Sequence, residues 1–96
     1  MRRRMAAEGV SGSWRSVNSG LGSLQIRALD VDPQRHDRVY AGTSGRGVYV
    51  SGDGGASWEV WNEGLGNLWV KALAMDVSSC DVLYAGTNDG VWERAV

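Results

Sequence analysis

Short runs of β-forming residues alternate along the chain with clusters of glycine, serine and aspartate. This alternation is typical of a strand-rich protein with many turns. The runs predict strands over residues 13–18, 24–32, 38–43, 47–51, 57–62, 68–76, 81–87 and 90 to about 94. The strands 24–32 and 68–76 carry apolar residues on both faces, so we expect neighbouring structure to cover both faces. The pattern therefore predicts an all-β fold.

The same strand pattern occurs twice. A shift of 44 positions brings Trp14 onto Trp58 and the run Tyr40–Thr43 onto Tyr84–Thr87. After position 43 the first copy carries one extra residue, and the shift becomes 43. A repeat of about 44 residues that contains several short strands is typical of the blades of a β-propeller.

The chain is cut out of phase with these blades. It begins with an outer strand at 13–18, continues with a full four-stranded blade at 24–62, and ends with three strands of another blade at 68–94. The sequence therefore predicts a β-propeller fragment of about two four-stranded blades over residues 13–96. Residues 1–12 are predicted to form a disordered N-terminal tail.

Residues 51–58, with the sequence Ser-Gly-Asp-Gly-Gly-Ala-Ser-Trp, connect the third and fourth strands of the full blade. The glycines supply the positive φ angles of a loop, and the Asp53 side chain can accept hydrogen bonds from loop amides. This pattern resembles the Asp-box, or BNR repeat, of sialidase-like and sortilin-like β-propellers. The resemblance implies a structural role in the turn for Ser51, Asp53, Gly55, Ser57 and Trp58. In the first copy, Gly9 stands where the aspartate belongs.

The resemblance to this superfamily extends over about residues 13–94. The runs that carry it are Gly20-Leu21, Ala28–Pro33, Val39–Thr43 and Gly47–Ser51. They are similar to repeats of secreted bacterial xyloglucan hydrolases, sortilin-like Vps10 domains and photosystem II assembly factors. Because these relatives differ in activity, the resemblance implies a fold and carries little functional information. It favours an extracytoplasmic location, although no signal peptide is recognised in the sequence.

Two blades alone leave apolar sheet faces exposed, together with an unpaired strand edge at residues 90–94. Strand 13–18 of a second copy can complete the three-stranded blade, and three or four chains would then close a ring of six or eight blades. Alternatively, the missing blades belong to a longer protein that contains this chain. The sequence leaves both possibilities open.

The composition narrows the classes of partner. The 96 residues carry a formal net charge of -1, and the only basic run is Arg2-Arg3-Arg4. Nucleic-acid binding and membrane-surface binding both need a concentrated basic face, so we expect neither. No apolar run has the length of a membrane span. The single cysteine, Cys80, cannot form an intramolecular disulfide and does not indicate a redox compartment.

Ligands of propellers generally bind on the face that carries the loops between blades. Trp69 stands there, at the position where the first copy has Gln25, and an exposed indole can stack on a sugar ring. Alternatively, Trp69 fills space between the blades. Arg46 is the extra residue of the first copy, and it either reaches a ligand carboxylate or hydroxyl or remains solvated. The predicted ligand-binding residues are Trp69, Arg46, Gln25, Asn67, Asn88 and Asp89.

Asp30 and Asp32 lie two residues apart on one strand, roughly 7 Å from each other, within the range of the acid pairs of glycoside hydrolases. Asp32 recurs as Asp76 before a turn, which indicates a turn residue, and Asp30 is expected to be a hydrated side chain facing a central channel. His36 is the only histidine, and no His/Cys cluster has the spacing of metal ligands. We therefore predict no catalytic residue, no metal and no cofactor.

These patterns together predict a non-catalytic β-propeller module for binding or assembly, which recognises a carbohydrate or a protein partner on its loop face. The alternative is a fragment of a secreted glycoside hydrolase of the xyloglucanase type. The arginine cluster of sialidases and the acid pair of xyloglucan hydrolases cannot be matched to this chain, which favours the binding module.

Overall fold

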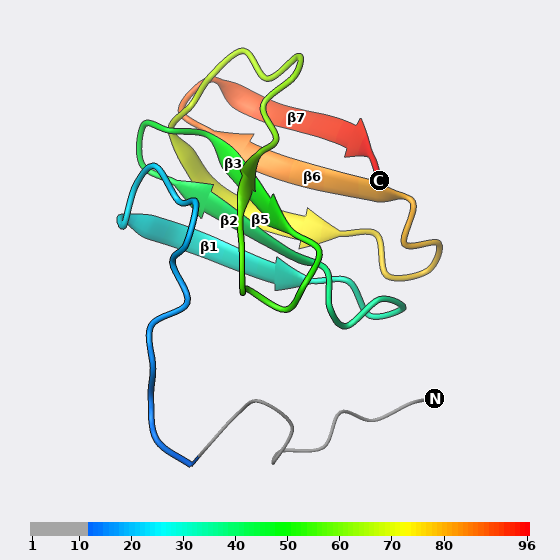
Figure 1. Cartoon of the computed structure of the whole chain (residues 1–96). Helices are drawn as coiled ribbons and strands as arrows, with labels where there is room; N and C mark the ends of the chain where they lie inside the picture. The colour runs from blue at the N-terminus through cyan, green and yellow to red at the C-terminus, as the bar shows by residue number, and fades with distance from the viewer. Residues whose placement is uncertain (1–11) are drawn as a thin grey trace.

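The computed structural model describes residues 12–96, which form seven β-strands and no helix (Figure 1). The strands are β1 (Ile26–Val31), β2 (Val39–Thr43), β3 (Val48–Ser51), β4 (Glu59–Val60), β5 (Val70–Met75), β6 (Val82–Thr87) and β7 (Gly90–Ala95). Each strand overlaps a run predicted from the sequence, and the all-β prediction is confirmed. Nothing in residues 12–96 is a helix that could cross a membrane. The tail predicted over residues 1–12 lies, except for residue 12, outside the described residues.

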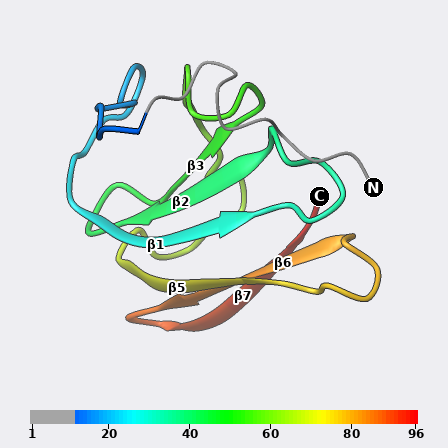
Figure 2. The same ribbon diagram turned by 90° about the horizontal axis from the view of Figure 1, so that it is seen from below.

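The strands form two antiparallel sheets, each in sequence order: β1-β2-β3-β4 and β5-β6-β7. Figure 2 shows the two sheets as layers that lie one over the other. Both sheets begin with the same irregularity, because the register shifts between Ile26 and Ala28 in β1 and between Val70 and Ala72 in β5. These positions are related by the repeat shift of the sequence. We call two residues related by this shift counterparts. For a residue of the first copy, the shift is 44 before position 47 and 43 from position 47 onwards.

One predicted strand is not formed. Residues 13–18 are not part of a strand, and the strand predicted over 57–62 is reduced to β4. A strand needs an edge with which to pair, and this N-terminal segment is held at the β3–β4 turn instead. The Val17 carbonyl accepts a hydrogen bond of 2.8 Å from Trp58 Nε1, and the Ser19 carbonyl accepts one of 2.8 Å from the Trp58 amide.

The core that joins the two sheets consists of side chains from the facing strands β2, β3, β5 and β6. Tyr40 on β2 is fully buried and packs with Met75 and Leu83 of the other sheet. Val48 on β3 packs with Val70 at the start of β5. Burial of apolar surface stabilises such an interface by about 25 cal/mol per Å². The two sheets are therefore one packed unit over the residues that the structure describes.

A polar contact also joins the sheets. The Asp30 carboxylate on β1 accepts a hydrogen bond of 2.7 Å from the main-chain N–H of Met75 on β5. Asp30 is half-buried, so the prediction of a hydrated side chain in a channel is wrong. The physical reason is that an amide removed from water needs an acceptor, and the neighbouring inner strand supplies one.

The outer face of each sheet is open in part: on the four-stranded sheet it is exposed along β1, while Ala41 and Tyr49 on the same face are buried together with Trp58. On the four-stranded sheet, Leu29 and Val31 of β1 are 63% and 47% exposed. On the three-stranded sheet, Tyr84 of β6 and Val91 of β7 are 37% and 75% exposed. Large apolar side chains gathered on a sheet face are typical of a surface that another element covers.

The turn between β3 and β4 is closed by its own side chains. Asp53 Oδ1 accepts hydrogen bonds from the Ser57 amide (2.9 Å) and from Ser51 Oγ (2.8 Å), and Asp53 Oδ2 accepts one from Ser57 Oγ (2.6 Å). Gly54 and Gly55 have φ angles of 71° and 97°, which glycine adopts without strain. The hydrogen bonds from Ser57 and then Ser51 hold the pKa of Asp53 below its ordinary value of 3.8.

The variant Asp53→Asn should melt several degrees below the unaltered chain at neutral pH, and this difference should shrink in acid. Because the folded pKa of Asp53 is lowered, its carboxylate stabilises the fold above about pH 4 and loses this effect as the pH falls through the folded pKa. Thermal melts by circular dichroism at a series of pH values measure the difference. Gly52→Ala is the control, since nothing lies within 4 Å of the added Cβ and no titrating group changes. A difference for Asp53→Asn that is constant with pH would contradict this role.

Candidate functional site

The loops that carry the predicted ligand-binding residues lie along one edge of the two sheets, at the starts of β1, β3, β5 and β7 (Figure 1). We call this edge, with residues 19–25, 44–47, 62–69 and 88–89, the loop edge. The Leu68 carbonyl accepts hydrogen bonds from the amides of Gly45 and Gly47. The Trp69 carbonyl accepts one from the Asn88 amide. These main-chain contacts fix the loops of both sheets relative to one another.

Trp69 has one supported side and one open side. Its side chain is 53% exposed, and a Cβ atom at position 45 would lie 3.4 Å from its ring, so Gly45 supports it closely. The Trp69 amide donates a hydrogen bond of 2.9 Å to the Asn67 side-chain oxygen. An indole held in this way can stack on a flat apolar face of a ligand.

A cavity of about 420 Å³ lies beside the Trp69 ring. It is lined by Arg27, Ser44, Trp69, Val70, Lys71 and Asn88. Arg27 Nε donates a hydrogen bond of 2.8 Å to Ser44 Oγ, which holds the guanidinium at the cavity wall. The two cationic side chains and the amide favour a ligand that offers oxygen acceptors, such as hydroxyl or carboxylate groups.

The predicted ligand-binding set overlaps this cavity in part. Trp69 and Asn88 line it, and Asn67 supports Trp69 through a hydrogen bond to its amide. The other three predicted residues lie on the loop edge without lining the cavity: Gln25, Arg46 and Asp89. The Arg46 side chain is exposed, while its main-chain N–H donates to Thr43 Oγ1.

Four residues of the lining were not predicted: Arg27, Ser44, Val70 and Lys71. Arg27 and Lys71 are counterparts of like charge, so comparison of the two copies indicated a role in the scaffold. Strand alternation does not find Lys71, because the register of β5 shifts between Val70 and Ala72, and the consecutive residues Trp69, Val70 and Lys71 all line the cavity.

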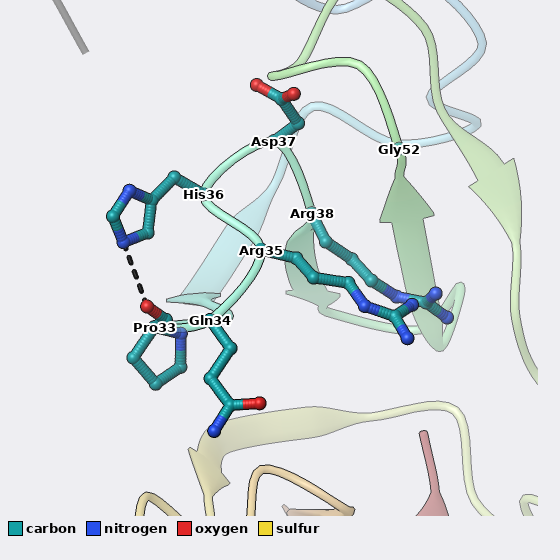
Figure 3. A pocket seen from close by; sticks show the side chains of 7 residues that line it. All are labelled: Pro33, Gln34, Arg35, His36, Asp37, Arg38 and Gly52. Carbon is teal, nitrogen blue, oxygen red and sulfur yellow. Dashed lines mark hydrogen bonds between the residues drawn. The ribbon is translucent and has the colours of Figure 1, made fainter. Parts of the chain in front are cut away.

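A second cavity, of about 690 Å³, lies at the opposite edge, against the turn from β1 to β2 (Figure 3). It is lined by Pro33, Gln34, Arg35, His36, Asp37, Arg38 and Gly52. Figure 3 shows the side chains of Arg35 and Arg38 running side by side. His36 Nε2 lies 2.8 Å from the Pro33 carbonyl, to which it donates, and this contact fixes the turn. Two adjacent guanidinium groups make this part of the surface electropositive.

Arg38 also covers a buried aromatic pair. Its guanidinium carbon lies 5.6 Å from the ring centre of Tyr40 and 5.9 Å from that of Trp61. Within residues 12–96 the Tyr40 hydroxyl is buried and makes no hydrogen bond, although Arg38 approaches it. Burial raises the pKa of Tyr40, and the charge of Arg38 opposes this effect only in part. Tyr40 therefore remains neutral at physiological pH.

The carboxylates considered for glycoside hydrolysis both bind main-chain amides. Asp32 is buried, and its Oδ1 accepts a hydrogen bond of 2.9 Å from the Gln34 amide. Its counterpart Asp76 accepts hydrogen bonds from the amide and the hydroxyl of Ser78 in the equivalent turn. Asp30 likewise accepts a hydrogen bond from a main-chain amide, that of Met75 on β5, so both acids of the pair have a structural contact. Among the described residues, no group of three or more His, Cys, Asp or Glu side chains is placed to hold a metal ion.

Comparisons of this chain with protein-family models, with curated proteins and with solved structures find no match. What the chain does has to be inferred from its own surfaces. The informative ones are the two open sheet faces and the cavity beside Trp69.

Proposed function

We propose that the chain is a non-catalytic β-propeller module, in which the two sheets are neighbouring blades and further copies of the chain close the ring. The observation that carries this proposal is the exposure of counterpart residues on the two open faces. In a propeller each blade packs on the next in the same way, so the residues of an internal interface recur on the faces at both ends of a fragment.

The outer face of the three-stranded sheet carries the counterparts of residues that are buried between the two sheets. Tyr40 and Val48 are 0% and 3% exposed, because the second sheet covers them. Their counterparts on the second sheet are Tyr84 and Val91, which are 37% and 75% exposed. The three-stranded sheet thus presents outwards the kind of surface that the four-stranded sheet buries within the chain.

The other end of the chain offers the complementary surface. Met75 and Leu83 are 8% and 3% exposed in the core between the sheets. The counterpart of Met75 is Val31, which is 47% exposed on the open face of the four-stranded sheet. Two complementary faces on one chain favour head-to-tail assembly of identical chains, with three or four of them forming a ring of six or eight blades.

Residues 13–18 have a place in such a ring. They are the counterparts of the segment that contains β4, and β4 pairs with β3 so that Glu59 lies opposite Val50. The same register between two copies adds residues 13–18 of one chain to the free edge of β7 in the next, with Arg15 opposite Glu93. Opposite charges directly across two strands stabilise their pairing.

The ring carries one Trp69 cavity per chain at its loop edge, and we assign ligand binding to this cavity. A half-exposed indole beside Arg27 and Lys71 favours a carbohydrate or an oxygen-rich surface of a protein partner. Several copies in one ring would bind a multivalent ligand more tightly than a single cavity does.

Light scattering behind a size-exclusion column should give a discrete particle of three or four chains of 10.3 kDa each. Arg15→Glu should reduce this mass, because it places two carboxylates opposite each other where strands of two copies pair. The exchanged pair, Arg15→Glu with Glu93→Arg, should restore it. A folded monomer for the unaltered chain overturns the ring, and a mass unaffected by Arg15→Glu overturns the strand register.

A further inference from the structure

A small cavity of about 130 Å³ lies between the two sheets, on the side of β7. Residues that line it include Trp61, Glu63, Leu65, Leu83, Trp92 and Arg94. Pockets for drug-sized ligands usually measure about 300–1,000 Å³, so this one can enclose only part of a single small ring. All of these residues come from one chain, and the site does not depend on the assembly proposed above.

Strand alternation sets which side chains enter the cavity from β7. Trp92 and Arg94 pair with Ala85 and Leu83 of β6, whose side chains are buried against the other sheet, so they share that face. Glu93 lies between them on the strand and points to the opposite face, so only its main chain borders the cavity. Of the carboxylates in the lining, the one that can reach the cavity is therefore that of Glu63.

The Trp92 ring is held at the wall of the cavity. Its Nε1 is buried and has no hydrogen-bond partner among the described residues. A Cβ atom at position 66 would lie 2.5 Å from the Trp92 ring, so the ring sits directly against Gly66 and is held in place. Because this N–H is buried, the part of Trp92 that borders the cavity is the carbon surface of its ring, which can pack on a ligand.

Arg94 and Glu63 complete a mixed polar lining. The Arg94 guanidinium stacks 3.8 Å above the ring centre of Trp61, and its Nη1 makes one long hydrogen bond of 3.4 Å to the Trp61 carbonyl. No carboxylate of the described residues forms an ion pair with it, so its remaining N–H groups are free to donate. The cavity thus combines N–H donors, a carboxylate acceptor and an apolar floor.

These side chains are not shared by the two copies of the repeat. Trp61, Glu63, Trp92 and Arg94 have as counterparts Val17, Ser19, Tyr49 and Ser51. The counterpart positions carry no arginine, carboxylate or indole, and two of them, Tyr49 and Ser51, lie buried in the equivalent strand β3. The two tryptophans and the two charges are therefore additions to the repeated scaffold.

We propose that this cavity binds one neutral sugar ring, a monosaccharide or the terminal unit of a glycan. Hydroxyl groups both donate and accept, which matches a lining of N–H donors and one carboxylate, whereas an anion would meet Glu63 and a cation would meet Arg94. The apolar faces of a pyranose ring suit the indole and the aliphatic floor. This site is separate from the cavity beside Trp69.

The test is titration of the full chain with glucose, galactose, mannose, fucose and N-acetylglucosamine. Binding is measured by calorimetry and by the change in tryptophan emission. We expect one sugar per chain to bind, and Trp92→Tyr and Arg94→Ser each to weaken binding about tenfold or more. Both variants introduce the counterpart residue, which the repeated backbone already accommodates. Arg35→Ser is the matched control, because it also introduces the counterpart residue, Ser79. Arg35 does not line the cavity, so the affinity of this variant for the sugar should be unchanged.

A second measurement needs no variant. With nitrogen-15 in the tryptophan side chains, the indole N–H resonance of Trp92 should shift strongly when the sugar is added. Absence of binding by all five sugars overturns the proposal. Loss of binding in Trp69→Ala with full binding in Trp92→Tyr would also overturn it and would place the sugar at the loop edge. These outcomes are independent of the particle mass that tests the ring.

Discussion

Tyr84→Glu should prevent the proposed ring from forming and leave single folded chains of 10.3 kDa. Tyr84 is 37% exposed on the open face of the three-stranded sheet, and its counterpart Tyr40 is completely buried in the equivalent position inside the chain. In the ring, a glutamate at position 84 would be buried against an apolar face without a partner. Such burial of an unpaired charge costs several kcal/mol, so the proposed interface should not form.

The matched control for this variant is Val77→Glu. Val77 is 74% exposed but lies in the turn after β5 and not on an open sheet face, so the added charge stays in water. The control should keep the mass of the assembled particle, and both variants should keep the strand signal in circular dichroism. If Tyr84→Glu retains the full mass, this face is not an interface between copies.

The strands could be predicted from the sequence because each is a short β-forming run between turn residues. The strand predicted over 13–18 is not formed, although this segment also looked like a β-forming run. Propensity describes how a side chain suits a sheet surface, but a strand also needs an edge, and within this chain the segment is held by Trp58. The hydrogen bond of Asp30 could not be predicted for a related reason. The position of the β5 amide that it binds depends on how the two sheets pack.

Of the two candidate sites, one could be predicted from the sequence and the other could not. Trp69 could be predicted because the scaffold accepts Gln25 at the counterpart position, so a tryptophan there is not required for packing. The cavity between the sheets could not be predicted, because Trp61 and Trp92 stand in runs that also suit a core. Their positions around a shared space, and the unpaired indole N–H, emerge only when β7 is placed against the loop after β4.

The largest loss of stability is expected for Tyr40→Ala. Tyr40 is fully buried, packs with Met75 and Leu83, and lies 5.2 Å from the Trp61 ring centre. Removal of a buried aromatic ring costs about 3–5 kcal/mol, and domains of this size are stable by about 5–15 kcal/mol in total. Urea unfolding followed by tryptophan emission, at one fixed protein concentration, should therefore show a midpoint shifted far towards low urea.

Tyr40→Phe separates the ring of this residue from its hydroxyl. Because the hydroxyl is buried and makes no hydrogen bond within residues 12–96, its removal leaves no other group unpaired and relieves its own desolvation. The ring contacts and the stacking of Arg38 are kept. The free energy of unfolding should be unchanged or higher by up to about 1 kcal/mol. A loss of more than about 1.5 kcal/mol would mean that the hydroxyl has a partner in solution, in which case Tyr40 is part of a polar contact as well as of the core.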